Sequence, residues 1–211
     1  MKIKLFGLLS LLGIYACNGQ NDKKENKVMA VEISANAEIA TFGAGCFWCV
    51  EAVFQNLRGV EKVASGYMGG NIDNPTYKQV CSGLTGHAEV IQIHYDPTQI
   101  SFEELLEVFW GTHDPTTLNR QGNDYGTQYR SVIFFHNENQ KHLAEKYKTK
   151  LNMEKVFSNP VITEISAASK FYVAEDYHQN YYNQNSNEGY CTFVIKPKLD
   201  KLKKAFSDKL K

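Results

Sequence analysis

Two cysteines at the spacing of a reversible dithiol are the residues of this chain best suited to chemistry. Cys46 follows the run Gly43-Ala44-Gly45 at a predicted strand-to-helix turn, and Cys49 comes three residues later. The start of a helix leaves backbone N–H groups unpaired and carries partial positive charge, which stabilises a thiolate. We therefore expect Cys46 to have a lowered pKa and to be reactive. A reversible Cys46–Cys49 disulfide is also feasible at this spacing.

A Cys-x-x-Cys motif by itself also fits other kinds of site. A zinc site needs two further ligands, and the sequence has no second Cys-x-x-Cys and no close Cys/His pair. A thioredoxin-type dithiol would need a parallel βαβ start and a cis-proline loop, of which the sequence gives no sign. A structural alternative is that the thiols of an exported domain, Cys81 and Cys191 included, form two disulfides. We expect Cys81 to be buried and inert.

The elements that must position these thiols follow from the hydrophobic pattern. Strands are predicted at 39–42, 60–67, 88–95, 130–136 and 161–165. Helices are predicted at 46–57, after the capping box of Ser101 and Glu104, at 138–153 and at 197–210. This order predicts an α+β fold, a ferredoxin-like two-layer sandwich with a βαββαβ core, extended loops and an irregular C-terminal segment. The long loops 66–86 and 113–128 are expected to build the site.

The N-terminal residues differ from the rest of the chain. Residues 1–16 combine two lysines with an apolar run too short to span a membrane, which is typical of a signal peptide. Ile14-Tyr15-Ala16-Cys17 resembles the bacterial lipoprotein cleavage box, so Cys17 is expected to carry lipid; the alternative is an ordinary signal peptide. Residues 17–37 are polar and predicted to be a disordered tether before a domain at 38–211. We expect the domain in the periplasm or at the cell surface, anchored to a bacterial membrane.

Composition narrows the choice of partners. The 211 residues are 43% hydrophobic and 12% aromatic, which suits one domain with a substantial core. The formal net charge is zero, so nothing points to nucleic acid. We expect a monomer with no metal and no organic cofactor, because sulfur can carry the electrons.

Four blocks of this sequence resemble the peptide methionine sulfoxide reductase A family. The first is Gly45-Cys46-Phe47-Trp48-Cys49-Val50-Glu51. The others are Asn74-Pro75-Thr76-Tyr77 with Cys81-Ser82-Gly83 and Thr85-Gly86-His87-Ala88-Glu89; His113-Asp114-Pro115 with 120–124 and 126–131; and 174–179 with Gly189-Tyr190-Cys191. The blocks span about residues 40–198, and two of them fall in the long loops.

The resemblance implies a role for each matching residue. Cys46 would attack the sulfoxide sulfur, and Glu89 would supply a proton to the sulfoxide oxygen. That requires burial to raise the pKa of Glu89, as Phe47 and Trp48 nearby would. Tyr77 and Tyr129 match the two phenols that hydrogen-bond the oxygen, and Asp124 matches an acid that helps hold the site. Phe47 and Trp48 match the pocket for the substrate methyl group. We expect His87 and His178 to be structural hydrogen-bonding residues.

The implied reaction leaves a sulfenic acid on Cys46, which a second thiol converts to a disulfide. Cys49 and Cys191 are both candidates for that resolving thiol, and we favour Cys49 because it lies one turn away. Cys191 leads into 192–195, which has the composition of a strand that would hold it in place. The resemblance implies the S epimer as substrate, in proteins or free, and a thioredoxin-like reductant. The rival hypotheses are a general thiol-disulfide oxidoreductase and a non-enzymatic, disulfide-stabilised lipoprotein.

Overall fold

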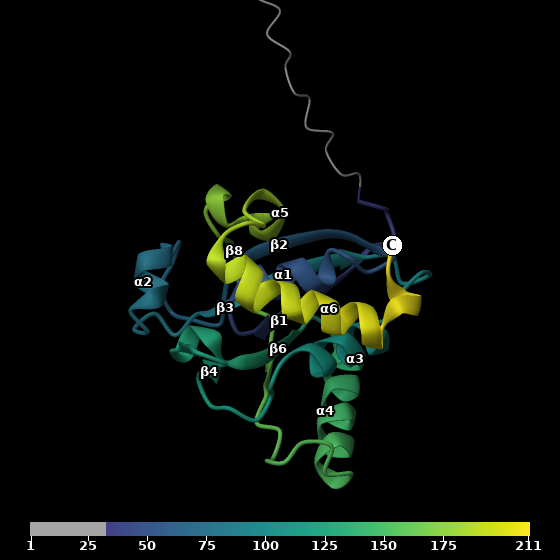
Figure 1. Ribbon diagram of the computed structural model, residues 1–211. Coiled ribbons are helices and arrows are strands. Elements are labelled where there is room, and N and C mark those ends of the chain that lie inside the picture. The colour runs from purple at the N-terminus through teal and green to yellow at the C-terminus, as the bar shows by residue number, and fades with distance from the viewer. Residues whose placement is uncertain (1–32) are drawn as a thin grey trace, which may run out of the picture. The chain divides into compact units, whose positions relative to one another are not determined.

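A six-stranded sheet forms the centre of residues 33–211, the part of the chain that the computed structural model describes (Figure 1). In spatial order the strands are β7 (Glu164–Ala167), β6 (Ser131–Phe135), β1 (Glu38–Ala44), β3 (Ala88–Tyr95), β2 (Val60–Met68) and β8 (Tyr172–Val173). Neighbours are antiparallel except β6 and β7. The order β6-β1-β3-β2 is that of a split βαβ sandwich, which confirms the predicted ferredoxin-like α+β fold.

Helices α1 (Phe47–Phe54), α3 (Phe102–Thr112) and α6 (Lys196–Ala205) share one hydrophobic core with the sheet. Figure 1 shows α6, in yellow, alongside α1, and the two helices contact each other. Helix α3 begins as predicted: the Ser101 side chain accepts the Glu104 N–H and the Glu104 carboxylate accepts the Ser101 N–H. The polar helix α4 (Glu138–Met153) has the predicted bounds and buries Ala144 in this core.

The sheet has a smaller apolar cluster on its other face. Successive side chains of a strand point to opposite faces, so Val90 and Val132 pack with Phe134 while Ile91 and Ile133 join the main core. Ala168 and Phe171, from the segment between β7 and β8, pack against this second cluster. The site described below therefore belongs to the helix-covered layer.

Two predicted strands differ in the structure. The last predicted strand begins at Glu164 instead of Val161, because the Val161 N–H donates to Asn152 Oδ1 and the Ile162 N–H to the Pro115 carbonyl. Residues 192–195 are not a strand but part of a π-helical turn, η3 (Cys191–Ile195). Cys191 and Ile195 are buried while Thr192 and Phe193 are exposed, and this four-residue periodicity favours a helix over the β-branched composition.

The two long loops contain short elements of their own. The first holds α2 (Tyr77–Cys81), which Thr76 and Gln79 open with a capping box. The second holds β4 (Arg120–Gln121), β5 (Asp124–Tyr125) and the 3₁₀ turn η1 (Thr127–Tyr129). The C-terminal segment is irregular as predicted and adds η2 (Asp176–His178), α5 (Tyr181–Gln184), η3 and, after α6, η4 (Ser207–Lys209).

The predicted signal peptide, Cys17 and most of the tether lie outside the described residues. Within 33–211, no helix is both long and apolar enough to cross a membrane. The same residues contain no group of three or more His, Cys, Asp or Glu side chains arranged to hold a metal ion.

Candidate active site

The turn between β1 and α1 places Cys46 at the N-cap of α1. Gly45 has a φ of 92°, and a Cβ there would lie 2.6 Å from the side chain of Gln121. Only glycine fits this left-handed and crowded position without strain. The Cys49 and Val50 N–H groups then donate to the Cys46 carbonyl, which closes the first turn and brings both thiols to the same end of α1.

The expected lowering of the Cys46 pKa is wrong. Cys46 is 8% exposed, and burial raises the pKa of its thiol well above the usual value, with further increases from the Cys49 thiol and the Glu89 charge. A hydrogen bond with Tyr190 opposes the rise. The Phe47 N–H at the helix start donates to Glu89 Oε2, at 3.1 Å. This donor serves a carboxyl group, so the helix N-terminus does not offset the burial of Cys46.

Cys49 is the thiol with the lowered pKa. Its hydrogen bond with Cys46 is the largest cause, and Lys198 and a hydrogen bond with Tyr190 act in the same direction. Burial and the charge of Asp124 oppose them, and the resulting pKa is about 7. A buried thiol of this kind is partly ionised at neutral pH and suited to attack a neighbouring sulfur.

Glu89 lies in β3 on the face toward α1 and is 1% exposed. Burial raises the pKa of its carboxyl group to about 8, and the charges of Asp124 and Cys49 add to the rise, while the Phe47 N–H opposes it. Among the described residues, Glu89 Oε1 has no hydrogen-bond partner. The sequence-based expectation of a protonated acid at this position agrees with this environment.

Tyr77 opens α2 and Tyr129 ends η1, so each long loop supplies one phenol. Both side chains are partly buried, and burial is the largest cause of the raised pKa of each phenol. The Glu89 charge raises both pKa values further, and a hydrogen bond with Cys81 also raises that of Tyr77. The charge of Cys46 adds to the rise for Tyr129. Both phenols therefore stay protonated at neutral pH and are hydrogen-bond donors beside Glu89.

Aromatic rings enclose this end of α1. The Phe47 ring is buried, with its centroid 4.9 Å from His178 and 6.4 Å from Tyr77. Trp48 is half-buried, stacks on Tyr181 at 3.7 Å, and donates its indole N–H to His178 Nδ1 at 3.1 Å. The structure thus places Phe47 and Trp48 together, and the expected hydrogen-bonding role of His178 agrees with its contact to Trp48.

His87 lies in the first long loop, away from these rings. Its Nδ1 accepts the Gly70 N–H at 3.1 Å, and its Nε2 lies 2.8 Å from the Ile72 carbonyl. These two backbone contacts fix the loop before β3, in agreement with the structural role expected for His87.

Tyr190 is a site residue that the sequence-based assignment missed. Its hydroxyl group donates to Asp124 Oδ2 at 2.7 Å and lies 3.7 Å from Cys49 Sγ. Through this bond Asp124 holds Tyr190 between the two thiols, which gives the predicted holding role of Asp124 a specific partner. The Gly189-Tyr190-Cys191 block was the available signal, but the resemblance assigns a role only to the cysteine of that block.

Two carboxylates that were also missed hold the segments around the site. Glu51 is 1% exposed and accepts the backbone N–H groups of Asn180 and Tyr181, which fixes the ring that stacks on Trp48. Glu175 accepts the Tyr67 hydroxyl group and the Tyr77 N–H, which fixes the start of α2. Glu51 and Glu175 both stand in the motif blocks, which was the available signal. A carboxylate removed from water is costly unless it is hydrogen-bonded, so these contacts also keep both groups stable in place.

The four cysteines of residues 33–211 are unpaired thiols. Cys191 is fully buried at the start of η3, and the Cys49 charge adds to the burial that raises its pKa. The expectation that Cys81 is buried is wrong, because Val80 is the residue of α2 that faces the core and Cys81 is exposed. The sulfur atom of this exposed residue is nevertheless partly covered, and its desolvation is the largest cause of the raised pKa of Cys81. A hydrogen bond with Tyr77 opposes the rise.

A buried cysteine beside a protonated acid and a second, partly ionised thiol defines a thiol-based oxidoreductase. Residues 38–210 match the family model described as peptide methionine sulfoxide reductase, and the chain belongs to this family. Within it, the chain is 54% identical over 187 residues to peptide methionine sulfoxide reductase MsrA 1 of Rhodopirellula baltica, covering 89% of this chain and 96% of that protein.

Two further comparisons agree. The chain is 58% identical over 172 residues to peptide methionine sulfoxide reductase MsrA of Acinetobacter baumannii, covering 82% of this chain and 98% of that protein. The structure is similar to reduced Mxr1 from Saccharomyces cerevisiae, with a TM-score of 0.69 and 34% identity over 78% of this chain and 94% of that chain. The chain is accordingly an enzyme, an oxidoreductase of the methionine sulfoxide reductase class.

Proposed function

We propose that the enzyme reduces the S epimer of methionine sulfoxide, in proteins or free, through Cys46. The observation that carries the proposal is the buried oxygen Oε1 of Glu89, which has no hydrogen-bond partner among residues 33–211. Burial raises the pKa of this carboxyl group to about 8, so it keeps a proton at neutral pH. A sulfoxide sulfur accepts a nucleophile once its oxygen is protonated or strongly hydrogen-bonded, which is the task of such an acid.

In the first step Cys46 Sγ attacks the sulfoxide sulfur while Glu89 gives its proton to the sulfoxide oxygen. Tyr77 and Tyr129 donate hydrogen bonds to that oxygen, and the substrate methyl group lies against Phe47 and Trp48. The S–S bond formed by this attack then breaks as the protonated oxygen moves from the methionine sulfur to the Cys46 sulfur. Methionine leaves, Cys46 becomes a sulfenic acid, and the thiol proton of Cys46 returns to Glu89. The sulfoxide sulfur is reduced by two electrons and the Cys46 sulfur is oxidised by two.

In the second step the Cys49 thiolate attacks the Cys46 sulfenic sulfur. The S–S bond forms, the S–O bond breaks, and the hydroxide leaves as water with the proton that Cys49 had carried. Cys191 is the alternative resolving thiol, but Cys49 shares the first turn of α1 with Cys46, and its pKa is lowered whereas that of Cys191 is raised. An external dithiol of the thioredoxin type then reduces the disulfide and resets the enzyme.

One assay separates this function from its rivals. We expect the protein to convert a dipeptide of methionine S-sulfoxide, but not of the R epimer, to methionine with dithiothreitol as reductant. A general thiol-disulfide oxidoreductase would reduce insulin disulfides and leave both sulfoxides unchanged. A disulfide-stabilised lipoprotein without activity would do neither, and either result would refute the proposal.

The place of the enzyme is also a proposal, supported by the N-terminal sequence. Residues 1–16 would be removed as a signal peptide, Cys17 would carry lipid, and residues 17–37 would tether a monomeric domain in the periplasm or at the cell surface. The reductant would then be an exported thioredoxin-like protein. Replacement of Cys17 by Ala should release the protein from membranes or block its processing; equal membrane association of the variant and the wild type would refute the anchor.

A further inference from the structure

A cavity of about 10 Å³ lies between Cys49 and α6. Its lining includes Cys49 of α1, His113 after α3 and Lys198 of α6. Space of this size holds about one water molecule at most. Lys198 and Cys49 therefore border the same small space, which is too small for bulk solvent.

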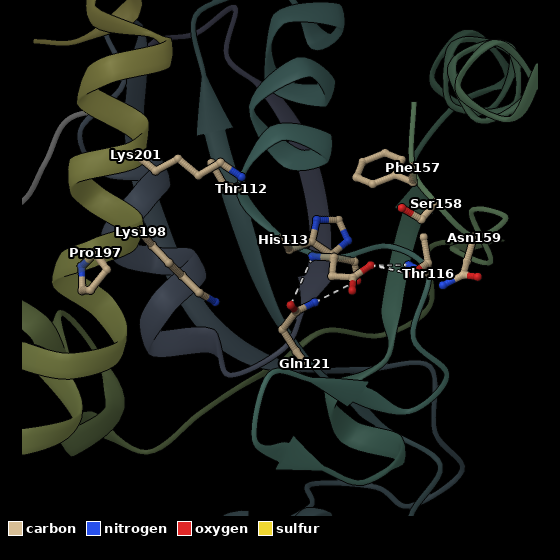
Figure 2. Close-up of a pocket in the computed structure, with 11 residues that line it drawn as sticks. Thr112, His113, Thr116, Gln121, Phe157, Ser158, Asn159, Pro197, Lys198 and Lys201 are labelled. Carbon is tan, nitrogen blue, oxygen red and sulfur yellow. Dashed lines mark hydrogen bonds between the residues drawn. The ribbon is translucent and has the colours of Figure 1, made fainter. Parts of the chain in front are cut away.

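Lys198 also lines an open pocket of about 680 Å³, which shares Thr112 and His113 with this cavity. Figure 2 shows Lys198 and Lys201 extending from α6 into this pocket, Lys201 toward Thr112. Lys198 is half-buried whereas Lys201, one turn later on the same helix, is exposed. Lys201 lines the open pocket but not the small cavity beside Cys49. The two lysines thus share a helix face and differ in access to the thiol.

Lys198 supplies the positive charge of the small cavity. His113 also lines it, but burial lowers the pKa of that imidazole to about 4, with a smaller contribution in the same direction from Lys198, so His113 is neutral at pH 7. Within residues 33–211, the ion pairs closer than 4.0 Å do not include Lys198. No carboxylate in direct contact therefore neutralises its ammonium group in this part of the chain.

We infer that Lys198 is a positioning residue for the second step, and that its ammonium group keeps Cys49 ready to attack the Cys46 sulfenic acid. The inference rests on the proposed function, because it concerns the thiol that resolves the sulfenic acid there. An ammonium group beside a thiolate lowers the free energy of the ionised thiol, and a thiol without a nearby cation lacks this stabilisation. Buried Cys191, whose pKa is raised, has no such lysine among the causes of its shift. Lys198 therefore selects Cys49 over Cys191 as the attacking thiol.

Several groups besides Lys198 set the protonation of Cys49. The Cys46 and Tyr190 hydrogen bonds favour the thiolate, while burial and Asp124 disfavour it. The groups that face Cys49 from the surrounding elements are Cys46, Glu89, Asp124, Tyr190, Cys191, His113 and Lys198. Of these, Lys198 can be neutralised without changing a group that touches the reacting sulfur atoms. Its removal is thus a clean test of the electrostatic contribution.

The test follows disulfide closure as a function of pH. The full chain is oxidised with one equivalent of methionine S-sulfoxide dipeptide without reductant, and remaining thiols are counted after rapid quenching. For the wild type, we expect the closure rate to rise with pH as Cys49 ionises and then to level off, which defines a midpoint. Lys198→Met keeps the apolar stem and removes the charge. It should move the midpoint up by about one unit and slow closure below the midpoint by about tenfold.

The matched control is Lys201→Met, which removes an exposed lysine one turn away and should leave the profile unchanged. Lys198→Arg should restore most of the wild-type profile, because the charge returns. A Lys198→Met profile with an unchanged midpoint, or one slowed equally at all pH values, would overturn the inference. If Lys198→Met does not fold, Lys198→Gln takes its place with the same expectation.

Failure of the proposed function would look different. The amount of methionine released in the first turnover does not depend on Lys198, so it should match the wild type in every lysine variant. Absence of methionine in the wild type would refute the sulfoxide reaction itself. Normal methionine release with closure that persists in Cys49→Ser would retain the activity and refute the role of Lys198.

Discussion

Glu89 and Cys49 both act on the pKa of Cys46, and the surroundings of these two groups shift their own pKa values in opposite directions. The surroundings of Glu89 are called the acid side below, and those of Cys49 the thiol side. On the Glu89 side, β3 and the long loops bring a carboxyl group and two phenols together, and burial raises the pKa of the acid to about 8. On the Cys49 side, hydrogen bonds and Lys198 outweigh burial and lower the pKa of the thiol to about 7. Both groups are almost fully buried. Burial alone thus does not set the protonation state; the partners that accompany it decide the direction.

The difference matches the two chemical tasks. The sulfoxide step needs a group that holds a proton at neutral pH, and the resolving step needs one that gives its proton up. Burial raises the pKa of Cys46, so in the proposed reaction its own proton leaves during the attack instead of before it. The following variants test each side in turn.

Replacing Cys46 by Ser removes the sulfur on which both Glu89 and Cys49 act in the proposed mechanism. The largest effect is therefore expected for this variant. A hydroxyl group is neither ionised nor nucleophilic enough at this position, so sulfoxide reduction should fall below detection in the dithiothreitol assay. Cys81→Ser is the control, because Cys81 is exposed and serine keeps a hydrogen-bonding group beside Tyr77. Measurable turnover in Cys46→Ser would end the proposed mechanism.

Glu89→Gln breaks the acid side alone. It keeps the shape and the Phe47 contact but removes the transferable proton, so methionine release in a single turnover should slow by about 10²–10⁴-fold. In the wild type, the rate of this step should fall as pH rises through about 8, the pKa of Glu89. A loss below about threefold, outside the usual range of a general acid, would assign the proton to the tyrosines.

The same carboxyl group should affect stability. Its pKa is about 8 in the folded chain against 4.5 when unperturbed, so between these values the native state holds a proton that the unfolded state has lost. The free energy of unfolding therefore decreases as pH rises through this window, by up to a few kcal/mol from this group. Glu89→Gln should remove that decrease, which urea titrations near pH 5 and pH 8 would measure. Parallel pH dependence in both proteins would contradict it.

Cys49→Ser breaks the thiol side and should leave methionine release intact while stopping the reaction at a sulfenic acid. Dimedone labelling of Cys46 after one equivalent of substrate measures this state. Cys191→Ser, by contrast, should still lose two thiols to a disulfide. The reverse pattern would assign resolution to Cys191, and loss of closure in both variants would indicate a relay through all three thiols.

Tyr190→Phe should have a smaller effect on the same side. It removes the hydroxyl group that bonds Asp124 and contacts Cys49, leaving the ring in place. Loss of a hydrogen bond to a charged group costs about 1.5–3 kcal/mol. We expect disulfide closure to slow by about tenfold and urea unfolding to shift accordingly. An unchanged closure rate would show that Cys46 and Lys198 suffice to prepare Cys49.

The sequence predicted the fold and the surroundings of Glu89 better than the surroundings of Cys49. The strand at 88–95 and the helix at 138–153 follow from periodicity alone, and both have the predicted bounds. The family resemblance placed Glu89 in the same site as Phe47 and Trp48, so its burial could be anticipated. The Cys46 pKa could not, because the sequence does not reveal that the Phe47 N–H binds Glu89. Lys198 and Tyr190 act on Cys49 from distant segments, and only tertiary packing brings them there.

The smallest effect is expected at the aromatic rings around the N-terminal end of α1, where Trp48 contacts His178. His178 Nδ1 accepts the Trp48 indole N–H, and burial lowers the pKa of His178, against the charge of Glu175, so the ring is neutral and can accept. His178→Phe keeps a ring but leaves that N–H without its acceptor, which costs about 1–3 kcal/mol when the donor is buried. Trp48 is only half-buried, so the lower end applies.

We expect a several-fold rise in KM for the sulfoxide dipeptide with kcat nearly unchanged, because the proposed function places Trp48 against the substrate methyl group and not at the reacting oxygen. In the wild type, KM should rise similarly on acidification, as protonation of His178 removes the acceptor. His142→Phe, on the exposed side of α4, is the control and should leave KM unchanged. A fall in kcat with constant KM in His178→Phe would instead place His178 on the acid side, where its contact with the Tyr77 ring could act on the sulfoxide oxygen.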